Sequence, residues 1–478
     1  MAQNDPHSRP GPSAGRLLPT VLSILALWAA LSGALALAED KAEPEKSVRS
    51  TFDSLSKDSA ICLSCHVEEH RGLYQQWGRS KHYGANVGCY ECHRAEAQDP
   101  DAFMHKKYLI SVLVTPKDCG RCHEKEYQQF SRSSHAHAGN FAGTPADTLA
   151  KVVQGTPHEA GLGAAMNGCW QCHGSKVAVT GSGKLDPATW PNSGIGRINP
   201  DGSLGACSAC HQRHEFSQIQ ARRPEACGKC HLGPAHPQKQ IYDESKHGIN
   251  FYANVNHLNL DSSKWVPGED FDTAPTCATC HMSATLKTPL THDTGERISW
   301  NLRGPIAMKV DELKKQDEKQ AEGKKSADDK RNAMQEVCVS CHTEKMVEGF
   351  YSQFDSVVEL YNEKFARPGL DLMQVLEKTG LRTPKEFDDP IEWTWFKIWH
   401  LAGRRVRHGA SMMAPDYVQW QGFYEIGELF YTRLLPQAEE MADKAWQAGN
   451  KTQATEVRDL IDKIRSRPDH LWSKRTAQ

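Results

Sequence analysis

Apolar residues recur at helical spacing in the last part of the chain, between residues 346 and 478. Spacings of three and four residues place side chains on one face of an α-helix. Three runs carry the pattern: Val357, Val358, Leu360, Tyr361 and Phe365; Leu429, Phe430, Leu434 and Leu435; and Val457, Leu460, Ile461 and Ile464. Pro368 and Gly369 are expected to punctuate the first run, and Gly449 separates the last two. The pattern predicts a bundle of long helices that packs on the preceding domain and offers a surface for contacts between subunits.

The chain before residue 346 lacks this regularity. Hydrophobic residues make up 38% of the 478 residues, and the mean hydropathy is −0.62. A chain this polar does not fill a large core with side chains alone. We therefore expect little regular sheet, many loops and short helices. Residues 180–206, rich in Gly, Pro, Ser and Asn, predict a long structured loop, and the charged residues 309–331 predict a solvated helix or tether.

The first 38 residues have the pattern of an export signal. Arg9 and Arg16 precede an uncharged apolar run, Leu17 to Ala38, which ends in Ala-Leu-Ala. A positive segment, an apolar segment and small residues at the end are typical of a cleaved signal peptide. The run is long enough to span a bilayer, so an uncleaved anchor is the alternative. We expect cleavage after residue 38, a periplasmic location and no stable membrane span in the mature protein.

Charge narrows the range of partners. The formal net charge is −2, with 57 basic and 59 acidic side chains. This balance gives no extended basic field for nucleic acid and no strong acidic field. Any surface that docks a redox partner must therefore be local.

All 16 cysteines belong to eight copies of Cys-x-x-Cys-His, numbered here as motifs 1 to 8 along the chain. The cysteine pairs are Cys62 and Cys65, Cys89 and Cys92, Cys119 and Cys122, Cys169 and Cys172, Cys207 and Cys210, Cys227 and Cys230, Cys277 and Cys280, and Cys338 and Cys341. The histidines that follow them are His66, His93, His123, His173, His211, His231, His281 and His342. A disulfide framework or zinc sites are the alternatives, but neither places His after every second Cys.

The motif is the attachment signature of c-type haem. Two thiols form thioethers to the porphyrin, and the histidine is the proximal iron ligand. Eight covalently attached haem c groups would supply the apolar surface that the side chains lack. The predicted fold is mainly α, with a haem-filled multihaem cytochrome c domain over 39–345 and a helical domain over 346–478. Export fits this chemistry, because c-type haem is attached outside the cytoplasm in bacteria.

Distal iron ligands must come from the remaining histidines. Of the 23 histidines, eight are proximal and one lies in the signal, which leaves 14. Three of them, His82, His135 and His247, each end a Ser-x-His sequence that an aromatic or apolar residue precedes by several positions, as if one unit had been reused. The other candidates are His105, His236 and His292, and either His400 or the histidine that follows Arg407, His408.

Four stretches resemble the octahaem hydroxylamine oxidoreductase family, which includes hydrazine dehydrogenase-like proteins. They are Trp190 to Ser203, Cys207 to His214, Ala221 to Gln238 and Ala274 to Ser283. The similarity extends from about residue 55 to about residue 435 and keeps the number and order of the haem motifs.

The resemblance implies seven bis-histidine haems and one open, catalytic haem at motif 4, above His173. A histidine and an acid are expected on its distal side. By position His214 is the candidate base, and Asp201 is the candidate acid, with Glu215 second. The alternative for His214 is a distal ligand to a neighbouring haem.

The resemblance also implies that oxidising members are homotrimers with a tyrosine of a neighbouring subunit linked to the catalytic porphyrin. Tyr417 is the better match for this residue and Tyr424 is the second. The alternative is that either is a packed helix aromatic.

The implied activity is oxidation of hydroxylamine to nitric oxide or nitrite. Hydrazine is a further candidate substrate. Electrons would then pass through the other haems to a soluble cytochrome c. Two alternatives stay open: a reductase for nitrite or hydroxylamine on the same fold, and an electron conduit without an enzymatic site.

Overall fold

A computed structural model describes residues 55–144, 147–155, 163–314 and 325–473. The predicted signal peptide lies outside these residues. Residues from Leu55 onward form one compact unit. The boundary expected at 345/346 falls just inside helix α18 (Glu344–Tyr361), so the helices continue directly from the motif-bearing part of the chain.

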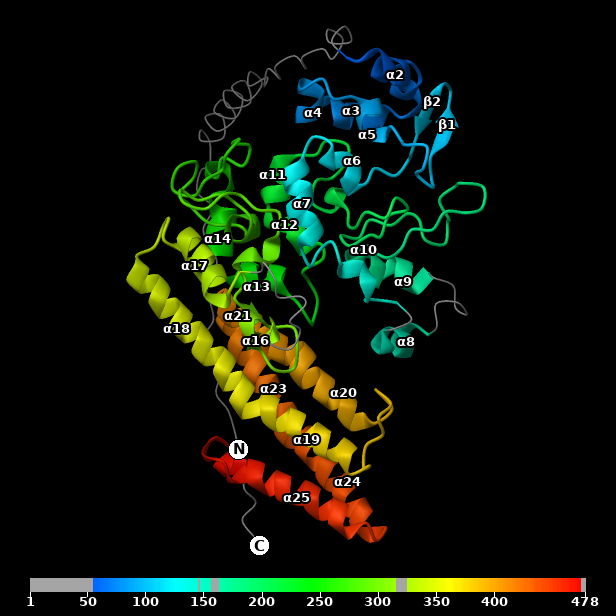
Figure 1. The fold of residues 1–478 in the computed structure, drawn as a ribbon. Coiled ribbons are helices and arrows are strands. Elements are labelled where there is room, and N and C mark those ends of the chain that lie inside the picture. Colours follow the sequence, from blue (N-terminus) through cyan, green and yellow to red (C-terminus); the bar gives the residue numbers. More distant parts are fainter. Residues whose placement is uncertain (1–54, 145–146, 156–162, 315–324, 474–478) are drawn as a thin grey trace, which may run out of the picture. The chain divides into compact units, whose positions relative to one another are not determined.

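Short helices and loops carry motifs 1 to 3 (Figure 1). The elements are α2 (Lys57–Glu69), α3 (Arg71–Gly78), α4 (Lys81–Gly84), α5 (Cys89–His93), β1 (Phe103–His105), β2 (Tyr108–Ile110), α6 (Pro116–Gly120) and α7 (Glu124–Arg132). Strands β1 and β2 form a small antiparallel sheet, with Phe103 opposite Ile110.

The middle of the described chain is equally irregular. Its helices are η3 (Ala138–Asn140), α8 (Thr148–Gln154), α9 (Gly163–Asn167), α10 (Cys169–His173), η4 (Cys207–Ala209), α11 (Gln218–Arg222), α12 (Pro224–Gly228), α13 (Gln238–Glu244), α14 (Lys246–Ala253), η5 (Val255–His257), α15 (Cys277–His281), η6 (Thr294–Arg297), α16 (Val310–Lys314) and α17 (Ala327–Cys338). Strands β3 (Trp300–Asn301) and β4 (Met308–Lys309) pair antiparallel. The mainly α fold with little sheet is confirmed for the described residues.

The predicted loop over 180–206 is ordered by buried polar contacts. Arg197 is 1% exposed, and its Nε donates to Asn199 Oδ1 at 2.6 Å. Its Nη2 donates to the backbone oxygen of Val114 at 3.0 Å. Gly194 packs so closely on motif 4 that an added Cβ would lie 2.0 Å from the backbone nitrogen of Gly174. The loop therefore packs closely against the segment that ends in His173.

Long helices follow motif 8, as predicted. They comprise α18, η8 (Asn362–Ala366), α19 (Arg367–Lys378), α20 (Pro390–Phe396), η9 (Lys397–Ala402), α21 (Gly403–Ser411), α22 (Pro415–Val418), η10 (Gln419–Tyr424), α23 (Glu425–Leu429), η11 (Phe430–Leu434), α24 (Leu435–Gln447), α25 (Lys451–Ser466) and η12 (Pro468–Ser473). Four of these segments, η8 to η11, are single π-helical turns that join α-helices into longer rods, as Figure 1 shows for α18 and α19.

Pro368 and Gly369 do not end the first helical run, contrary to expectation. Pro368 occupies the first turn of α19, directly after the π-turn η8. A wider turn there accommodates a residue without a backbone N–H. Gly369 lies against Trp395, because an added Cβ would come within 2.3 Å of the indole ring. The pair therefore serves helix packing and not chain reversal.

The C-terminal helices bury an ordinary apolar core. Its fully buried members include Leu372, Leu376, Ile398, Phe430 and Leu434. Leu360, which shares the first apolar run, is 47% exposed and lies off this face. No described helix is long and apolar enough to cross a membrane.

Leu434→Ala should destabilise the bundle. The side chain is 0% exposed, and truncating a buried leucine typically costs about 2–5 kcal/mol through lost transfer energy and the cavity left behind. Denaturant unfolding followed by circular dichroism would measure the loss. Leu360→Ala is the matched control and should change the unfolding free energy by less than about 0.5 kcal/mol. Equal losses in both variants would contradict the assignment of the core face.

Candidate functional site

The Cys-x-x-Cys-His motifs form compact local units. In motifs 2, 4 and 7 the five residues make one short helix each, α5, α10 and α15. A helical turn places cysteines three residues apart on the same side. None of the 16 cysteines forms a disulfide. This arrangement suits two thioether bonds to one porphyrin.

Six proximal histidines face a second histidine across a gap of the right size. Two imidazoles bound to one metal ion have ring centres about 6 Å apart, since each metal–nitrogen bond is about 2 Å. The six pairs and their centroid distances are His66–His105 (6.1 Å), His93–His214 (6.5 Å), His123–His82 (6.1 Å), His211–His292 (6.5 Å), His231–His135 (6.0 Å) and His342–His247 (6.1 Å). The residues therefore fit axial ligation of haem iron at these motifs.

The reused serine–histidine unit is visible in the structure. The hydroxyls of Ser80, Ser133 and Ser245 each donate to the carbonyl oxygen three residues earlier, at 2.6–2.7 Å. Each also accepts from the backbone N–H three residues later, at 3.1–3.4 Å. The serine thus caps the turn that carries the histidine two positions on. Backbone geometry fixes His82, His135 and His247 in the same way.

Neighbouring thiols reveal the spatial order of the motifs. Thiols of different motifs interact in seven pairs: Cys62–Cys89, Cys92–Cys119, Cys119–Cys207, Cys210–Cys227, Cys227–Cys277, Cys280–Cys338 and Cys172–Cys230. Motifs 1, 2, 3, 5, 6, 7 and 8 follow one another in a row. Motif 4 adjoins motif 6 as a side branch. A group at the end of a branch need not pass electrons onward.

His173 of motif 4 has no histidine opposite it at ligation distance among the described residues. Burial lowers its pKa, and nearby His236 lowers it further. The pKa of His236 is lowered by burial and by Arg404, and that of His400 falls to about 3 through burial, Arg404 and His236. The Nδ1 atoms of His236 and His400 are buried without a hydrogen-bond partner. Each of these imidazoles therefore keeps one ring nitrogen without a hydrogen-bond partner, a feature shared by the predicted distal ligands His214 and His292.

Two arginines of α21 make this region positively charged. Arg404 Nη1 lies 3.4 Å from His400 Nε2, and its Nε and Nη2 atoms donate to the backbone oxygen of Arg303 at 3.2 and 2.6 Å. Arg407 is fully buried and donates only to backbone carbonyls. Neither guanidinium has a carboxylate partner among the described residues, and burial lowers the pKa of Arg404 to about 10. A positive charge that is partly buried and has no carboxylate partner favours an anionic ligand.

One carboxylate acts on His173. Asp147 caps α8 by accepting from the backbone N–H of Ala150 at 3.2 Å, and it also accepts from Gly143 at 3.1 Å. It raises the pKa of His173, against the larger effect of burial. Its oxygens are committed to backbone donors, so it orders the chain beside motif 4.

His214 lies at motif 2, not at motif 4. Its ring stacks against the proximal His93 at 6.5 Å with an interplanar angle of 25°. This geometry favours the alternative, a distal ligand to a neighbouring haem, and does not support the assignment of His214 as base. The sequence places it only four residues after the motif 5 cysteine Cys210, whereas folding carries it to motif 2.

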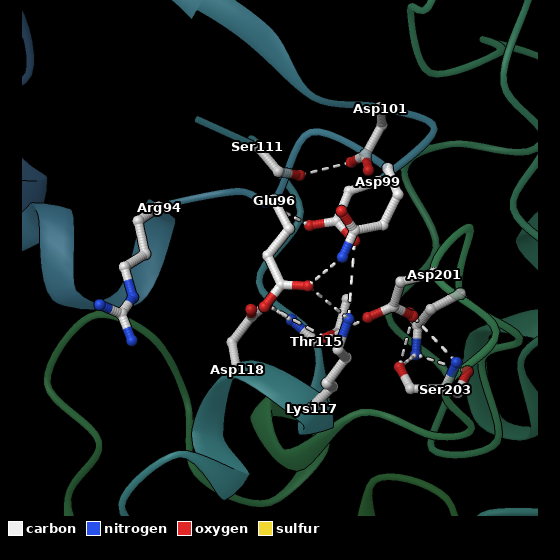
Figure 2. A network of polar contacts seen from close by, with 12 residues as sticks. Arg94, Glu96, Asp99, Asp101, Ser111, Thr115, Lys117, Asp118, Asp201 and Ser203 are labelled. Carbon is white, nitrogen blue, oxygen red and sulfur yellow. Dashed lines mark hydrogen bonds and ion pairs between the residues drawn. The ribbon is translucent and has the colours of Figure 1, made fainter. Parts of the chain in front are cut away.

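Asp201 and Glu215 are also engaged elsewhere. Figure 2 shows the Asp201 carboxylate between Thr115 and Ser203. It accepts from the Thr115 hydroxyl at 2.8 Å and from the Ser203 hydroxyl at 2.7 Å. Glu215 pairs with Arg79 at 3.5 Å. Neither acid is brought to His173, so the expected distal acid is not supplied by these residues.

The two candidate tyrosines differ in exposure. Tyr417 is 7% exposed and packs with Ile241 and Ala414 of its own chain. Tyr424 is 59% exposed beside Trp420, which is 60% exposed. A tyrosine that reaches a neighbouring subunit must be exposed, so the geometry favours Tyr424 and leaves Tyr417 as a packed helix aromatic.

The remaining predicted ligands divide into two groups. His105 and His292 stand opposite proximal histidines, as expected of distal ligands. His236 and His400 do not. His408 is buried near His231 and His236, and both lower its pKa, after burial and two arginines. His281 of motif 7 has its Nδ1 atom 3.3 Å from the Thr294 backbone oxygen. His236, which lies between Pro234 and Pro237 just after motif 6, was predicted as a distal ligand, and its proximity to His173 is what the sequence did not indicate.

Two protein families match parts of the chain. "Seven times multi-haem cytochrome CxxCH" covers residues 200–386, and "Cytochrome c554 and c-prime" covers residues 25–94 and 118–196. The chain is a multihaem cytochrome c. The motifs therefore bind haem c covalently, and the molecule carries electrons.

Two relatives are similar over part of their length. A probable nitrite reductase-hydroxylamine oxidoreductase fusion protein of Kuenenia stuttgartiensis is 24% identical over 389 residues, 73% of this chain and 41% of that protein. The multiheme cytochrome MtrA of Shewanella baltica is 22% identical over 210 residues, 41% of this chain and 52% of that protein. The matches thus span about half or less of these relatives.

Two solved structures share the fold. A hypothetical multiheme protein has a TM-score of 0.69 and 26% identity, over 84% of this chain and 99% of that one. The reducing HAO-like protein complex Kustc0457/Kustc0458 of Kuenenia stuttgartiensis has a TM-score of 0.59 and 19% identity, over 84% and 88%. The mainly α multihaem fold is thereby confirmed.

His214→Ala should convert one low-spin haem to high spin. Removal of a distal imidazole leaves the iron opposite His93 with a free position. Electron paramagnetic resonance of the purified holoprotein would measure the number of high-spin haems. His257→Ala, at an exposed histidine, is the control and should leave the spin count unchanged. A variant with an unaltered spin count would contradict the His93–His214 pairing.

Proposed function

We propose that this protein is a periplasmic octahaem reductase that converts nitrite, or hydroxylamine, to ammonia at the haem of motif 4. The carrying observation is the cluster of residues near His173, which consists of the imidazoles of His236 and His400 and two arginines without carboxylate partners. Eight motifs support eight haem c groups. The remaining haems would conduct electrons along the row of motifs.

An open iron at motif 4 is supported by two independent features. His173 has no partner ring at ligation distance in the described chain, whereas six other proximal histidines do. Motif 4 is also the single branch in the order given by the thiol pairs, through Cys172 and Cys230. Motif 7 shares the first feature but lies in the row between motifs 6 and 8, where it must conduct.

The positive charge of the arginines near motif 4 favours an anion. Nitrite carries a negative charge and two acceptor oxygens, while hydroxylamine is neutral at pH 7. The guanidinium of Arg404 offers donors in a fixed fork suited to such a planar anion. A haem held by Cys169, Cys172 and His173 would supply the electrons and an open iron position for the substrate. His236 and His400 would relay protons from solvent, which the reduction consumes in large number, because burial lowers the pKa of both rings and keeps them neutral.

Proton supply must accompany electron transfer. Reduction of nitrite to ammonium takes six electrons and eight protons and releases two waters. Without protons, negative charge would build up in a site of low dielectric. The unpartnered Nδ1 atoms of His236 and His400 are placed to relay them, and stacking of His400 on Phe396 at 4.3 Å fixes its ring. Arg405 holds the loop in place by donating to the Pro234 oxygen at 3.1 Å.

The relatives support the same chemistry without assigning it. One is named a probable nitrite reductase-hydroxylamine oxidoreductase fusion, and one structure a reducing HAO-like complex. The donor in our proposal is a reduced soluble cytochrome c. Export by the signal at residues 1–38 remains part of the proposal.

A second candidate is hydroxylamine oxidation, with hydrazine as a further substrate and a soluble cytochrome c as acceptor. The exposed Tyr424 beside Trp420 favours it, because this residue is free to contact a neighbouring subunit of a homotrimer. A tyrosine link to the motif 4 porphyrin would change its electronics. Denaturing electrophoresis of the purified holoprotein separates the candidates: a haem-linked trimer favours oxidation, and a monomer favours reduction.

His236→Ala should lower nitrite turnover by about 10²–10⁴-fold, the usual contribution of a positioned proton donor. It should not add a high-spin haem, because His236 is not an axial ligand in this assignment. Stopped-flow turnover with a reduced artificial donor and paramagnetic resonance would be measured together. A new high-spin iron with full turnover would instead make His236 the sixth ligand at motif 4.

Arg404→Met should raise the KM for nitrite about tenfold or more, since a hydrogen bond to a charged group contributes about 1.5–3 kcal/mol. The KM for neutral hydroxylamine should change much less. Arg367→Met removes an exposed arginine paired with Glu363 and is the control. Equal effects on both substrates would show that Arg404 supports the fold or a porphyrin carboxylate and does not select anions.

A further inference from the structure

The proximal histidine of motif 1 has an unusual neighbour. When Nε2 of a histidine binds a metal, Nδ1 carries the proton and donates to a nearby group. In three other motifs that group is a carbonyl or amide oxygen: Ser111 O at 2.8 Å from His93, Gln238 Oε1 at 3.3 Å from His231, and Thr294 O at 3.3 Å from His281. In motif 1 the Nδ1 of His66 lies 2.9 Å from the Nδ1 of His70, an imidazole.

His70 is too close to His66 to be its partner across an iron. Two nitrogen atoms on opposite sides of one metal ion are about 4 Å apart, twice a bond of about 2 Å. The observed 2.9 Å is a hydrogen-bond distance. The ring centroids are 5.0 Å apart, against 6.1 Å for His66 and His105. His105 therefore suits the distal position, and His70 contacts the side of His66 that faces away from the iron.

The end of α2 fixes this contact. His70 is the C-cap of the helix, and its backbone N–H donates to the His66 oxygen at 3.0 Å. Residues four apart share one helix face. Glu69 Oε2 lies 3.9 Å from His66 Nδ1, beyond hydrogen-bond reach. The imidazole of His70, and not the carboxylate, is therefore within hydrogen-bond reach of His66 Nδ1.

We propose that His70 is a positioning residue that lowers the reduction potential of the haem of motif 1. Its Nδ1 lone pair accepts the proton of His66 Nδ1–H, with its own proton on Nε2. This bond holds the His66 ring and increases the electron density on its Nε2 atom. A more basic axial ligand stabilises ferric over ferrous iron, so the one-electron reduction becomes less favourable.

This tuning has a role at the end of the row of motifs. Motif 1 adjoins only motif 2 among the described thiol pairs, through Cys62 and Cys89. A low-potential haem at a terminus passes electrons readily to the interior. The effect of His70 is a property of motif 1 alone, so it holds whether the motif 4 haem reduces or oxidises its substrate.

His70→Phe tests the proposal in the purified holoprotein. Spectroelectrochemical titration should show one haem whose reduction equilibrium constant rises about tenfold, which is about 59 mV for a one-electron couple. His70→Gln keeps an acceptor oxygen and should stay near the wild-type value. His257→Phe, at an exposed histidine outside the motifs, is the control and should leave all potentials unchanged.

Three outcomes would overturn the proposal. Unchanged potentials in His70→Phe would show that the contact does not tune the haem. A new high-spin haem in that variant would make His70 an axial ligand. His66, Glu69 and His70 are also close enough to share a metal ion. A potential that rises when wild-type protein is dialysed against a chelator would mean that a bound metal ion, and not the hydrogen bond, sets it. Loss of nitrite reduction alone would bear on the function and not on this contact.

Discussion

Facing pairs of imidazole rings are the constraint on which the rest of the structure depends. Each pair must hold a gap of about 6 Å for one iron. The two members come from distant segments, as with His93 and His214 or His211 and His292. In a chain of low apolar content, haems held by these pairs would add apolar surface to the small side-chain clusters of this part, such as the one around Phe251 and Trp265. Short helices and capped turns suffice, because their task is to set ring positions.

Around His173 no second imidazole completes such a facing pair in the described chain, and the residues around it are of a different kind. Where a second ligand is missing, buried imidazoles and guanidinium groups collect instead. Charges that are costly to bury are tolerated when a ligand or a reaction step compensates them. The residues around His173 thus differ from those around the conducting motifs, both in the number of facing histidines and in their charge.

The C-terminal helices contribute both to an apolar core and to the polar residues near His173. Their core is a conventional apolar one, around residues such as Phe430 and Leu434. The same rod that contributes to it carries His400 and Arg404 to the loop that holds His236. A packed helix is a rigid support for charged side chains that have no carboxylate partner. The bundle is therefore a part of the candidate active site as well as a separate helical layer.

The sequence by itself determined the chemistry that is local. Eight Cys-x-x-Cys-His motifs, the reused serine–histidine units and the helical runs after residue 346 follow from spacings of a few residues, and the structure has them. Even Pro368 and Gly369 were misjudged only because a π-turn and a close contact with Trp395 override a local rule. Only the tertiary structure decided which ring faces which. His214 and Asp201 lie near motif 5 in sequence, yet folding brings them to His93 and Thr115. His236 and Arg404 are 168 positions apart in sequence, yet they lie together near motif 4. Axial pairing is a long-range contact, and spacing along the chain carries no information about it.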